Sequence, residues 1–181
     1  LQEFMSPSEN TRDDQWGGSF ENRTRLCIDV FKAIRDVWPE HKPIGVRLSA
    51  TDYLEGGWSL EETTELCRRL RSLGCDYAAI SSGGLSLDQK VPIGEGHQVG
   101  FARTVREGSG LPVMCVGMIF RPKHAEKIIS DRDADLVGLA RGMLQDPHWP
   151  WRAAAELDAE VTYPPQYIRG YRSKWHRTQR Y

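Results

Sequence analysis

A stretch in which an apolar run meets a small-residue turn and then an arginine is the first place where this sequence could do chemistry. Residues 137–144 read Val-Gly-Leu-Ala-Arg-Gly-Met-Leu, so that a predicted strand ends just before Ala140 and a helix follows. A helix start offers unpaired backbone N–H groups and the positive end of the helix dipole, and Arg141 adds a forked cation. These features suit a phosphate, although most strand-turn-helix junctions bind nothing.

Three further groups of unusual residues also stand where predicted strands end. Arg47 is a charge within the aliphatic run 43–49, residues 81–84 read Ser-Ser-Gly-Gly, and Gly117 follows the apolar run 112–116. In a parallel sheet such positions gather at one edge. For Arg47 the structural alternative is an ion pair with a carboxylate.

The elements that must position these residues alternate along the chain. Helical spacing of apolar residues predicts a helix from Phe20 to about Trp38, capped by Ser19 and stopped by Pro39. Further helices are predicted from the capping box of Ser59 and Glu62 to Gly74, over 99–107 and over 122–129, and strands over 43–49, 76–81, 112–116 and 134–139. Residues 1–19, dense in turn formers, are predicted to form an ordered loop.

This alternation implies right-handed βαβ crossovers and a parallel sheet covered by helices. Two architectures compete, a doubly wound open sheet and part of a (β/α)8 barrel. A complete barrel takes about 250 residues, and this chain of 181 residues offers only four predicted strands. Because the unusual residues stand at strand ends, which converge on the mouth of a barrel, half a barrel is favoured.

Composition limits the partners. The 24 basic and 25 acidic residues leave a net charge of -1, which gives no field to attract nucleic acid or an anionic membrane. No bilayer-spanning segment or signal peptide is visible, so a cytoplasmic location is the default expectation. The cysteines lie in apolar patterns without C-x-x-C spacing and the histidines are dispersed, which predicts core thiols and no metal site: Cys27, Cys67, Cys75 and Cys115.

The loop before the first helix carries a long motif. Residues 6–23 read Ser-Pro-Ser-Glu-Asn-Thr-Arg-Asp-Asp-Gln-Trp-Gly-Gly-Ser-Phe-Glu-Asn-Arg, which resembles the S-P-x-x-N-x-R-x-D-x-[YW]-G-G-S-x-E-N-R signature of the Old Yellow Enzyme family of FMN-dependent ene-reductases. The other strand-end residues follow in the family's order, so the resemblance covers nearly the whole chain. The ending, residues 165–171, resembles that of the bacterial thermophilic-like subgroup.

The resemblance implies that this chain is the C-terminal half of a single (β/α)8 barrel domain. It would supply strands 5 to 8 with their helices in residues 20–157, after the loop 1–19 and before a tail over 158–181. It also implies FMN as the cofactor, with NADPH or NADH as the hydride donor.

The resemblance assigns roles to five strand-end residues. Arg47 would lie beside the pyrimidine end of the flavin, where a fixed guanidinium stabilises the negative charge of the reduced ring. Ser81, Gly117, Ala140 and Arg141 would surround the ribityl phosphate, where small residues let backbone N–H groups approach. Many relatives have glycine where this chain has Ala140, and an alanine keeps the N–H but disfavours a left-handed backbone.

Other residues of the motif and the loops are expected to be structural. Glu21, Asn22 and Arg23 are predicted to fix the loop against the first helix rather than to contact substrate. For Tyr53 and Trp58, on the loop after the first strand, a place at the mouth and a packing role remain open.

The tail mixes basic and aromatic residues: Arg169, Arg172, Lys174, Arg177 and Arg180 with Tyr167, Tyr171, Trp175 and Tyr181. In isolation this composition could bind single-stranded nucleic acid. The resemblance implies instead a homo-oligomer in which the tail crosses a dimer interface and Arg169 reaches the active site of the neighbouring subunit.

The family's catalytic residues are not expected in this chain. The histidine pair, or histidine and asparagine, that holds the substrate carbonyl and the tyrosine that donates a proton lie before the Ser6 signature in the family, and no H-x-x-[HN] pair occurs here. Four strands alone would also leave two unpaired edges and an uncovered apolar interior. A second polypeptide or segment carrying strands 1 to 4 is therefore predicted.

The predicted function is that of an FMN-dependent NAD(P)H ene-reductase, active only with the missing half. It would reduce the C=C bonds of small α,β-unsaturated carbonyl compounds. Two alternatives remain: a family member that reduces nitro compounds or dienoyl thioesters, and a non-catalytic half barrel that binds phosphate.

Overall fold

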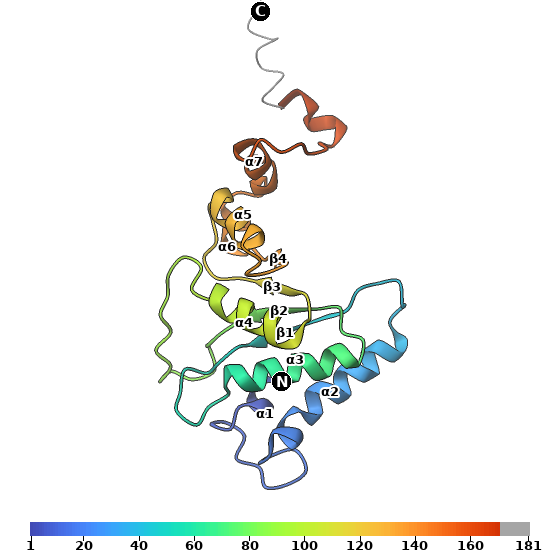
Figure 1. Ribbon diagram of the computed structural model, residues 1–181, viewed down its shortest axis with the longest axis vertical. Helices are drawn as coiled ribbons and strands as arrows, with labels where there is room; N and C mark the ends of the chain where they lie inside the picture. Colours follow the sequence, from blue (N-terminus) through green and yellow to red (C-terminus); the bar gives the residue numbers. More distant parts are fainter. Residues whose placement is uncertain (171–181) are drawn as a thin grey trace, which may run out of the picture.

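Four parallel strands in the order β1-β2-β3-β4 form the centre of the chain (Figure 1). This computed structural model describes residues 1–170, and the rest of the basic and aromatic tail, residues 171–181, lies outside the described part. The elements are α1 (Gln2–Met5), α2 (Phe20–Val37), β1 (Gly45–Ser49), α3 (Leu60–Ser72), β2 (Tyr77–Ser81), α4 (Val99–Ser109), β3 (Val113–Cys115), α5 (Pro122–Ser130), β4 (Leu136–Val137), α6 (Arg141–Gln145), α7 (Trp149–Glu156) and the 3-10 helix η1 (Pro165–Gly170). The predicted alternation of strands and helices is confirmed.

The strand order decides between the two predicted architectures for the described strands. Every neighbouring pair is parallel, and strands that are neighbours in space are also consecutive in the chain. A doubly wound sheet reverses its strand order at a switch point, whereas a barrel adds each strand beside the previous one. No reversal occurs within residues 1–170, so the order is that of a barrel segment.

The two faces of the sheet have different surroundings. Side chains alternate between the faces of a strand, and one set of registered residues is buried in the core: Leu48, Ala78, Ile80, Val113 and Cys115. The other set crosses all the strands in register: Arg47, Ala79, Met114 and Leu136. Arg47 is exposed and 44% of the Leu136 surface is accessible, so this second face is open at both of its edges.

The helices form as their sequences predict. In α3, Leu66, Cys67 and Leu70 are fully buried on one face, and the predicted capping box of Ser59 and Glu62 is present in both directions. Gly74 follows the end of this helix with φ +88°, a backbone conformation that favours glycine. None of the helices within residues 1–170 combines the length and the hydropathy needed to cross a bilayer.

Two elements differ most from their predictions. The last strand, predicted over 134–139, is observed only at Leu136–Val137, because it lies at the sheet edge and has β3 as its one neighbour in the described part. The loop 1–19 includes the single helical turn α1. Four residues are too few to show a helical periodicity in the sequence.

The loop 1–19 is ordered through its motif residues, as predicted. The Asn10 side-chain amide donates to the carbonyl oxygens of Phe4, at 2.6 Å, and of Trp16, at 2.7 Å. The Ser6 hydroxyl donates to the carboxylate of Asp52 at 2.5 Å. Because Asp52 lies after β1, these bonds fasten the loop to the carboxyl end of the sheet.

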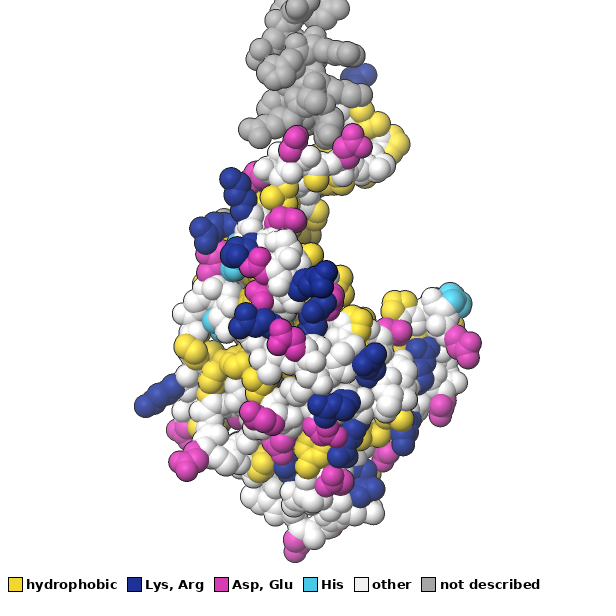
Figure 2. Space-filling view, viewed as in Figure 1, with side chains coloured by type: hydrophobic (Ala, Val, Ile, Leu, Met, Phe, Trp, Pro, Cys, Tyr) yellow, Lys and Arg dark blue, Asp and Glu magenta, His cyan; other side chains and the backbone are white. Residues whose placement is uncertain are grey.

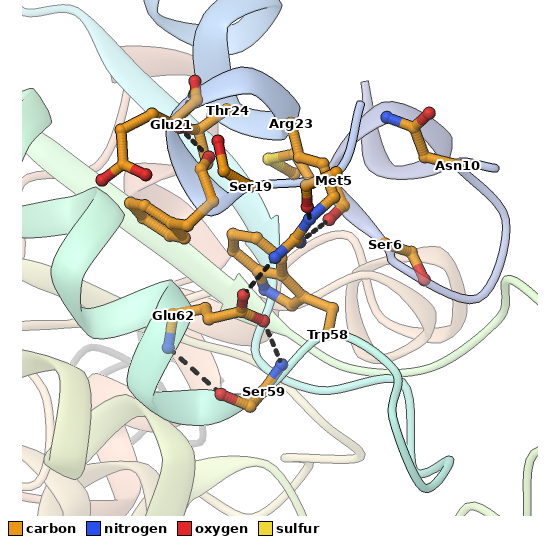
Figure 3. A network of polar contacts seen from close by, with 12 residues as sticks. Met5, Ser6, Asn10, Ser19, Glu21, Arg23, Thr24, Trp58, Ser59 and Glu62 are labelled. Carbon is orange, nitrogen blue, oxygen red and sulfur yellow. Dashed lines mark hydrogen bonds and ion pairs between the residues drawn. The ribbon is translucent and has the colours of Figure 1, made fainter. Parts of the chain in front are cut away.

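Arg23 joins the same loop to two helices (Figure 3). Only 7% of its side chain is exposed. Its Nε donates to the Gly18 carbonyl at 2.9 Å, another of its N–H groups donates to the Met5 carbonyl, and Nη2 contacts Glu62 Oε1 at 2.6 Å. Glu62 therefore serves both the capping box of α3 and this ion pair. The prediction that Arg23 fixes the loop is confirmed.

Replacing Arg23 with methionine should lower the free energy of unfolding by about 2–4 kcal/mol, since it leaves buried carbonyls and a carboxylate without their donor. Denaturant titration measures this. The matched control is Arg103→Met, because Arg103 is exposed and its ion pair with Asp133 spans 3.4 Å, and it should cost less than about 1 kcal/mol. Equal losses in the two variants would contradict the structural role of Arg23.

Candidate functional site

A cavity of about 370 Å³ opens where β3 and β4 end. Its walls come from β1, from the segment before α4, from the ends of β3 and β4 and from the start of α6: Arg47, His97, Gln98, residues 116–120 and residues 138–142. The carboxyl ends of parallel strands meet at one edge of a sheet, so segments far apart in the sequence share this cavity. The predicted convergence is observed here for Arg47, Gly117, Ala140 and Arg141.

Two arginines supply the charge of the cavity. Arg47 precedes the buried Leu48 in β1, so its side chain lies on the open face of the sheet, and Arg141 is the first residue of α6. Within residues 1–170 neither guanidinium forms a hydrogen bond or an ion pair, and the described lining contains no aspartate or glutamate. The carboxylate partner considered for Arg47 is thus not found in the described part. The cavity is suited to an anion.

Glycines let the backbone form the cavity wall. Gly117 has φ +116°, and a Cβ atom there would lie 3.2 Å from the His97 ring. A Cβ at Gly138 would lie 2.9 Å from Val116 Cγ1, closer than real contacts allow. Ala140, where many relatives have glycine, has φ -101°, which lies outside the left-handed region that favours glycine. The turn at Ala140 therefore does not require a left-handed backbone.

The remaining predicted site residues lie outside this cavity. Ser81 lines an adjoining hollow of about 390 Å³, together with Arg47 and the residues of α1, and its hydroxyl donates to the Leu48 carbonyl at 3.3 Å. Arg169 lies in η1, exposed and well away from the sheet along the chain's long axis (Figure 1). The structure thus brings together Arg47, Gly117, Ala140 and Arg141, and it places Ser81 next to them. The functional roles of these residues stay predictions.

Sequence reasoning missed His97 and Gln98. Gln98, only 7% exposed, donates from Nε2 to the Ser82 hydroxyl at 2.9 Å, and that hydroxyl is also 2.8 Å from the Tyr53 hydroxyl. Both missed residues precede α4 in a long loop after β2, and their only sequence signal is a polar pair between Gly96 and the apolar start of the helix.

Tyr53 and Trp58, whose roles the sequence left open, lie in different surroundings. Trp58 is 1% exposed, stacks on Phe20 and donates from Nε1 to the Thr63 hydroxyl at 2.6 Å, so it is a packing residue. Tyr53 lies on the loop after β1 and contacts Ser82 beyond the end of β2.

The cysteines are thiols of the core, as predicted. All four are free and buried, and burial raises the pKa of Cys67 to about 12 and the pKa of Cys27, Cys75 and Cys115 to about 11. Across residues 1–170 the side chains of histidine, cysteine, aspartate and glutamate form no group of three that could hold a metal ion.

Basic and acidic side chains are mixed over the surface of the protein. Figure 2 shows basic and acidic side chains interspersed over the visible face, without a field of one sign. Beside α5, the exposed Arg121 contacts Glu95 at 2.6 Å. The positive and negative charges of this pair offset each other. This pairing agrees with the near-neutral net charge.

A parallel α/β chain with a positively charged cavity at its strand ends is the arrangement in which β/α-barrel proteins bind phosphate-bearing ligands. The family model described as NADH:flavin oxidoreductase / NADH oxidase family matches residues 1–160. The chain belongs to this family. Membership indicates FMN as the family's cofactor and NADPH or NADH as its electron donor, and it confirms the resemblance drawn from the motif in residues 6–23.

Individual relatives agree with this assignment. The chain is 38% identical over 172 residues to an NADPH dehydrogenase of Geobacillus thermodenitrificans and 36% identical over 172 residues to one of Listeria innocua, covering 95% of this chain and 50% of each relative. The chain thus spans about half the length of these relatives.

Solved structures with the same fold include those of larger enzymes. A 2-naphthoyl-CoA reductase matches with a TM-score of 0.78 and 28% identity, over 85% of this chain and 24% of that protein. Morphinone reductase matches with a TM-score of 0.65 and 26% identity, over 91% of this chain and 42% of that protein. These are barrel enzymes of the same family, and the described strands form a parallel α/β segment of such a barrel.

The folded protein should resist alkylation by iodoacetamide at about pH 8, because the thiolate is the reactive form and burial disfavours it. Unfolded protein should react at all four cysteines. Mass spectrometry after a timed reaction counts the labelled residues. Rapid labelling of a cysteine in the folded protein would contradict the core assignment of that residue.

Proposed function

We propose that this chain forms one side of an FMN site in an NAD(P)H-dependent ene-reductase that reduces the C=C bonds of α,β-unsaturated carbonyl compounds. The cavity at the ends of β3 and β4 carries the proposal. It combines two guanidinium groups that lack acidic partners in the described part with wall positions where the backbone itself is exposed. A phosphate monoester with a polar ring system is the ligand that such a lining suits.

Different residues of the cavity would contact different parts of FMN. Arg141 would hold the phosphate through a charge-assisted hydrogen bond, and Gly117 and Ala140 would let backbone N–H groups approach it. Arg47, across the cavity on β1, would neutralise the negative charge that the pyrimidine end gains on reduction. Ser81 would contribute from the adjoining hollow. When bound, FMN would supply the hydride transfer from NAD(P)H to the acceptor.

The open face of the sheet supports the proposal of a second part. The residues Arg47, Ala79, Met114 and Leu136 lie in register on a face that the described elements leave open at both edges. A parallel sheet is normally buried on both faces. We propose that strands 1 to 4, on another polypeptide or segment, close the barrel over this face, so that the present strands become 5 to 8. The groups that bind and protonate the substrate would come from that part.

Two further observations bear on the substrate that accepts the hydride and on the assembly of subunits. The likeness to 2-naphthoyl-CoA reductase keeps thioester acceptors as the second candidate substrate class. Arg169 is exposed and forms no ion pair within residues 1–170, which suits a residue that reaches into a neighbouring subunit of a homo-oligomer.

The proposal is tested by expressing the chain with the other half of the Geobacillus thermodenitrificans relative. We expect the two polypeptides to copurify with bound flavin, seen as visible absorption, and to oxidise NADPH when an enone is added. Thioester and nitro acceptors, assayed in parallel, rank the alternative substrate classes. A colourless chain that neither copurifies with the other half nor binds added FMN would contradict the proposal.

Arg141→Ala should weaken FMN binding by about 10- to 100-fold, because a hydrogen bond to a charged group contributes about 1.5–3 kcal/mol. The flavin content after extensive dialysis and the dissociation constant measure the effect. Arg103→Ala, which removes an exposed arginine of α4 outside the cavity, is the matched control and should leave both unchanged. Full flavin retention by the Arg141 variant would refute the phosphate role.

A further inference from the structure

His97 is the one histidine of the described cavity lining. It lies in the segment before α4 and packs against the end of β3, where a Cβ on Gly117 would be 3.2 Å from ring atoms Cε1 and Nδ1. The backbone holds it there, because the Gly96 N–H donates to the Gly117 carbonyl at 2.8 Å. The imidazole is therefore fixed in the cavity wall.

The contacts of the ring show which nitrogen is left without a hydrogen bond within residues 1–170. Nδ1 of His97 lies 2.7 Å from the Gly94 carbonyl oxygen, and since a carbonyl can only accept, Nδ1 carries a proton and donates it. Nε2 makes no hydrogen bond within residues 1–170, and it is not among the buried unsatisfied atoms of that part, so it reaches accessible space. In the neutral ring Nε2 can only accept a hydrogen bond. In the protonated ring it becomes a charged donor.

Charged groups near His97 come from the cavity lining and from its own loop. Arg47 from β1 and Arg141 from α6 line the same cavity, and the described lining holds no carboxylate. Two residues before His97, Glu95 is engaged by Arg121 at 2.6 Å and by His124 at 3.0 Å. A protonated His97 thus has no acidic partner within the described part, and an anion bound beside the two arginines would supply one.

We propose that His97 is a pH-dependent third contact for the phosphate of the ligand, donating from Nε2 when the ring is protonated. This inference rests on the proposed FMN site. Binding of the phosphate and protonation of the ring then favour each other, so that the ring takes up a proton on FMN binding and the contribution of His97 to the affinity rises as the pH falls. Arg47 and Arg141 line the same cavity and set the affinity that remains at higher pH.

The test is the dissociation constant of FMN for the flavin-depleted protein, measured between about pH 5.5 and 8 by fluorescence quenching. The wild type is compared with His97→Gln and with His97→Asn, whose side-chain amides can still donate toward Gly94 but do not titrate. His41→Gln, an exposed histidine outside the cavity, is the control. The phosphate of FMN also titrates, but it does so equally for every protein, so the ratio of dissociation constants isolates the histidine.

We expect the ratio of variant to wild type to be near one at the alkaline end and to grow toward acid by up to about tenfold for each pH unit, the limit for one proton. Riboflavin, which lacks the phosphate, should show no such growth. Proton uptake on FMN binding, measured in weakly buffered solution, should be smaller in both variants than in the wild type.

The outcomes separate this inference from the site on which it rests. A ratio that is constant with pH, or equal growth with riboflavin, would overturn the role of His97 while leaving the FMN site intact. Absence of FMN binding to the wild type at every pH would overturn the FMN site and this inference together. A change in His41→Gln equal to that in the His97 variants would also overturn the assignment.

Discussion

A parallel sheet needs cover on both of its faces, and this constraint governs the whole structure. Helices cover the face that carries Leu48, Ile80 and Cys115, which explains why the strands are short and aliphatic. The opposite face presents a charge at Arg47 and open apolar surface at Leu136. The cavity lies at the end of this same open face. Under the proposed function, the cover that the sheet requires and the groups that would complete the site come from the same second part.

The residues of the signature motif lie outside the cavity and make structural contacts. Its residues Ser6, Asn10 and Arg23 contact Asp52, backbone carbonyls and Glu62, and none of them lines the cavity. They hold a long irregular loop against the carboxyl end of β1, which fixes the segment next to Arg47. The motif thus identifies the family through residues that hold the scaffold together. The residues that line the cavity are scattered along the sequence, and each of them alone is a weak indication of function.

This division explains what the sequence could predict. Helix ends, caps and the strand alternation depend on local patterns, so Ser19, the Ser59 capping box and Pro122 were predicted at their observed places. The convergence of Arg47 with Arg141 followed from the rule that parallel strands share one carboxyl edge. His97 could not be found in this way, because its place depends on the path of a long loop and on a contact with Gly117. The two-residue extent of β4 also depends on its neighbours rather than on its own sequence.

The anchoring of loop 1–19 has a consequence for recombination between relatives. The loop makes its buried hydrogen bonds within itself and to Asp52 and Arg23, both of which lie in this chain. Exchanging barrel halves at a junction on the N-terminal side of this loop would keep those bonds intact, whereas a junction between the loop and α2 would separate Arg23 from Met5 and Ser6 from its neighbours. The contacts thus define a unit of exchange whose limit does not coincide with the first helix.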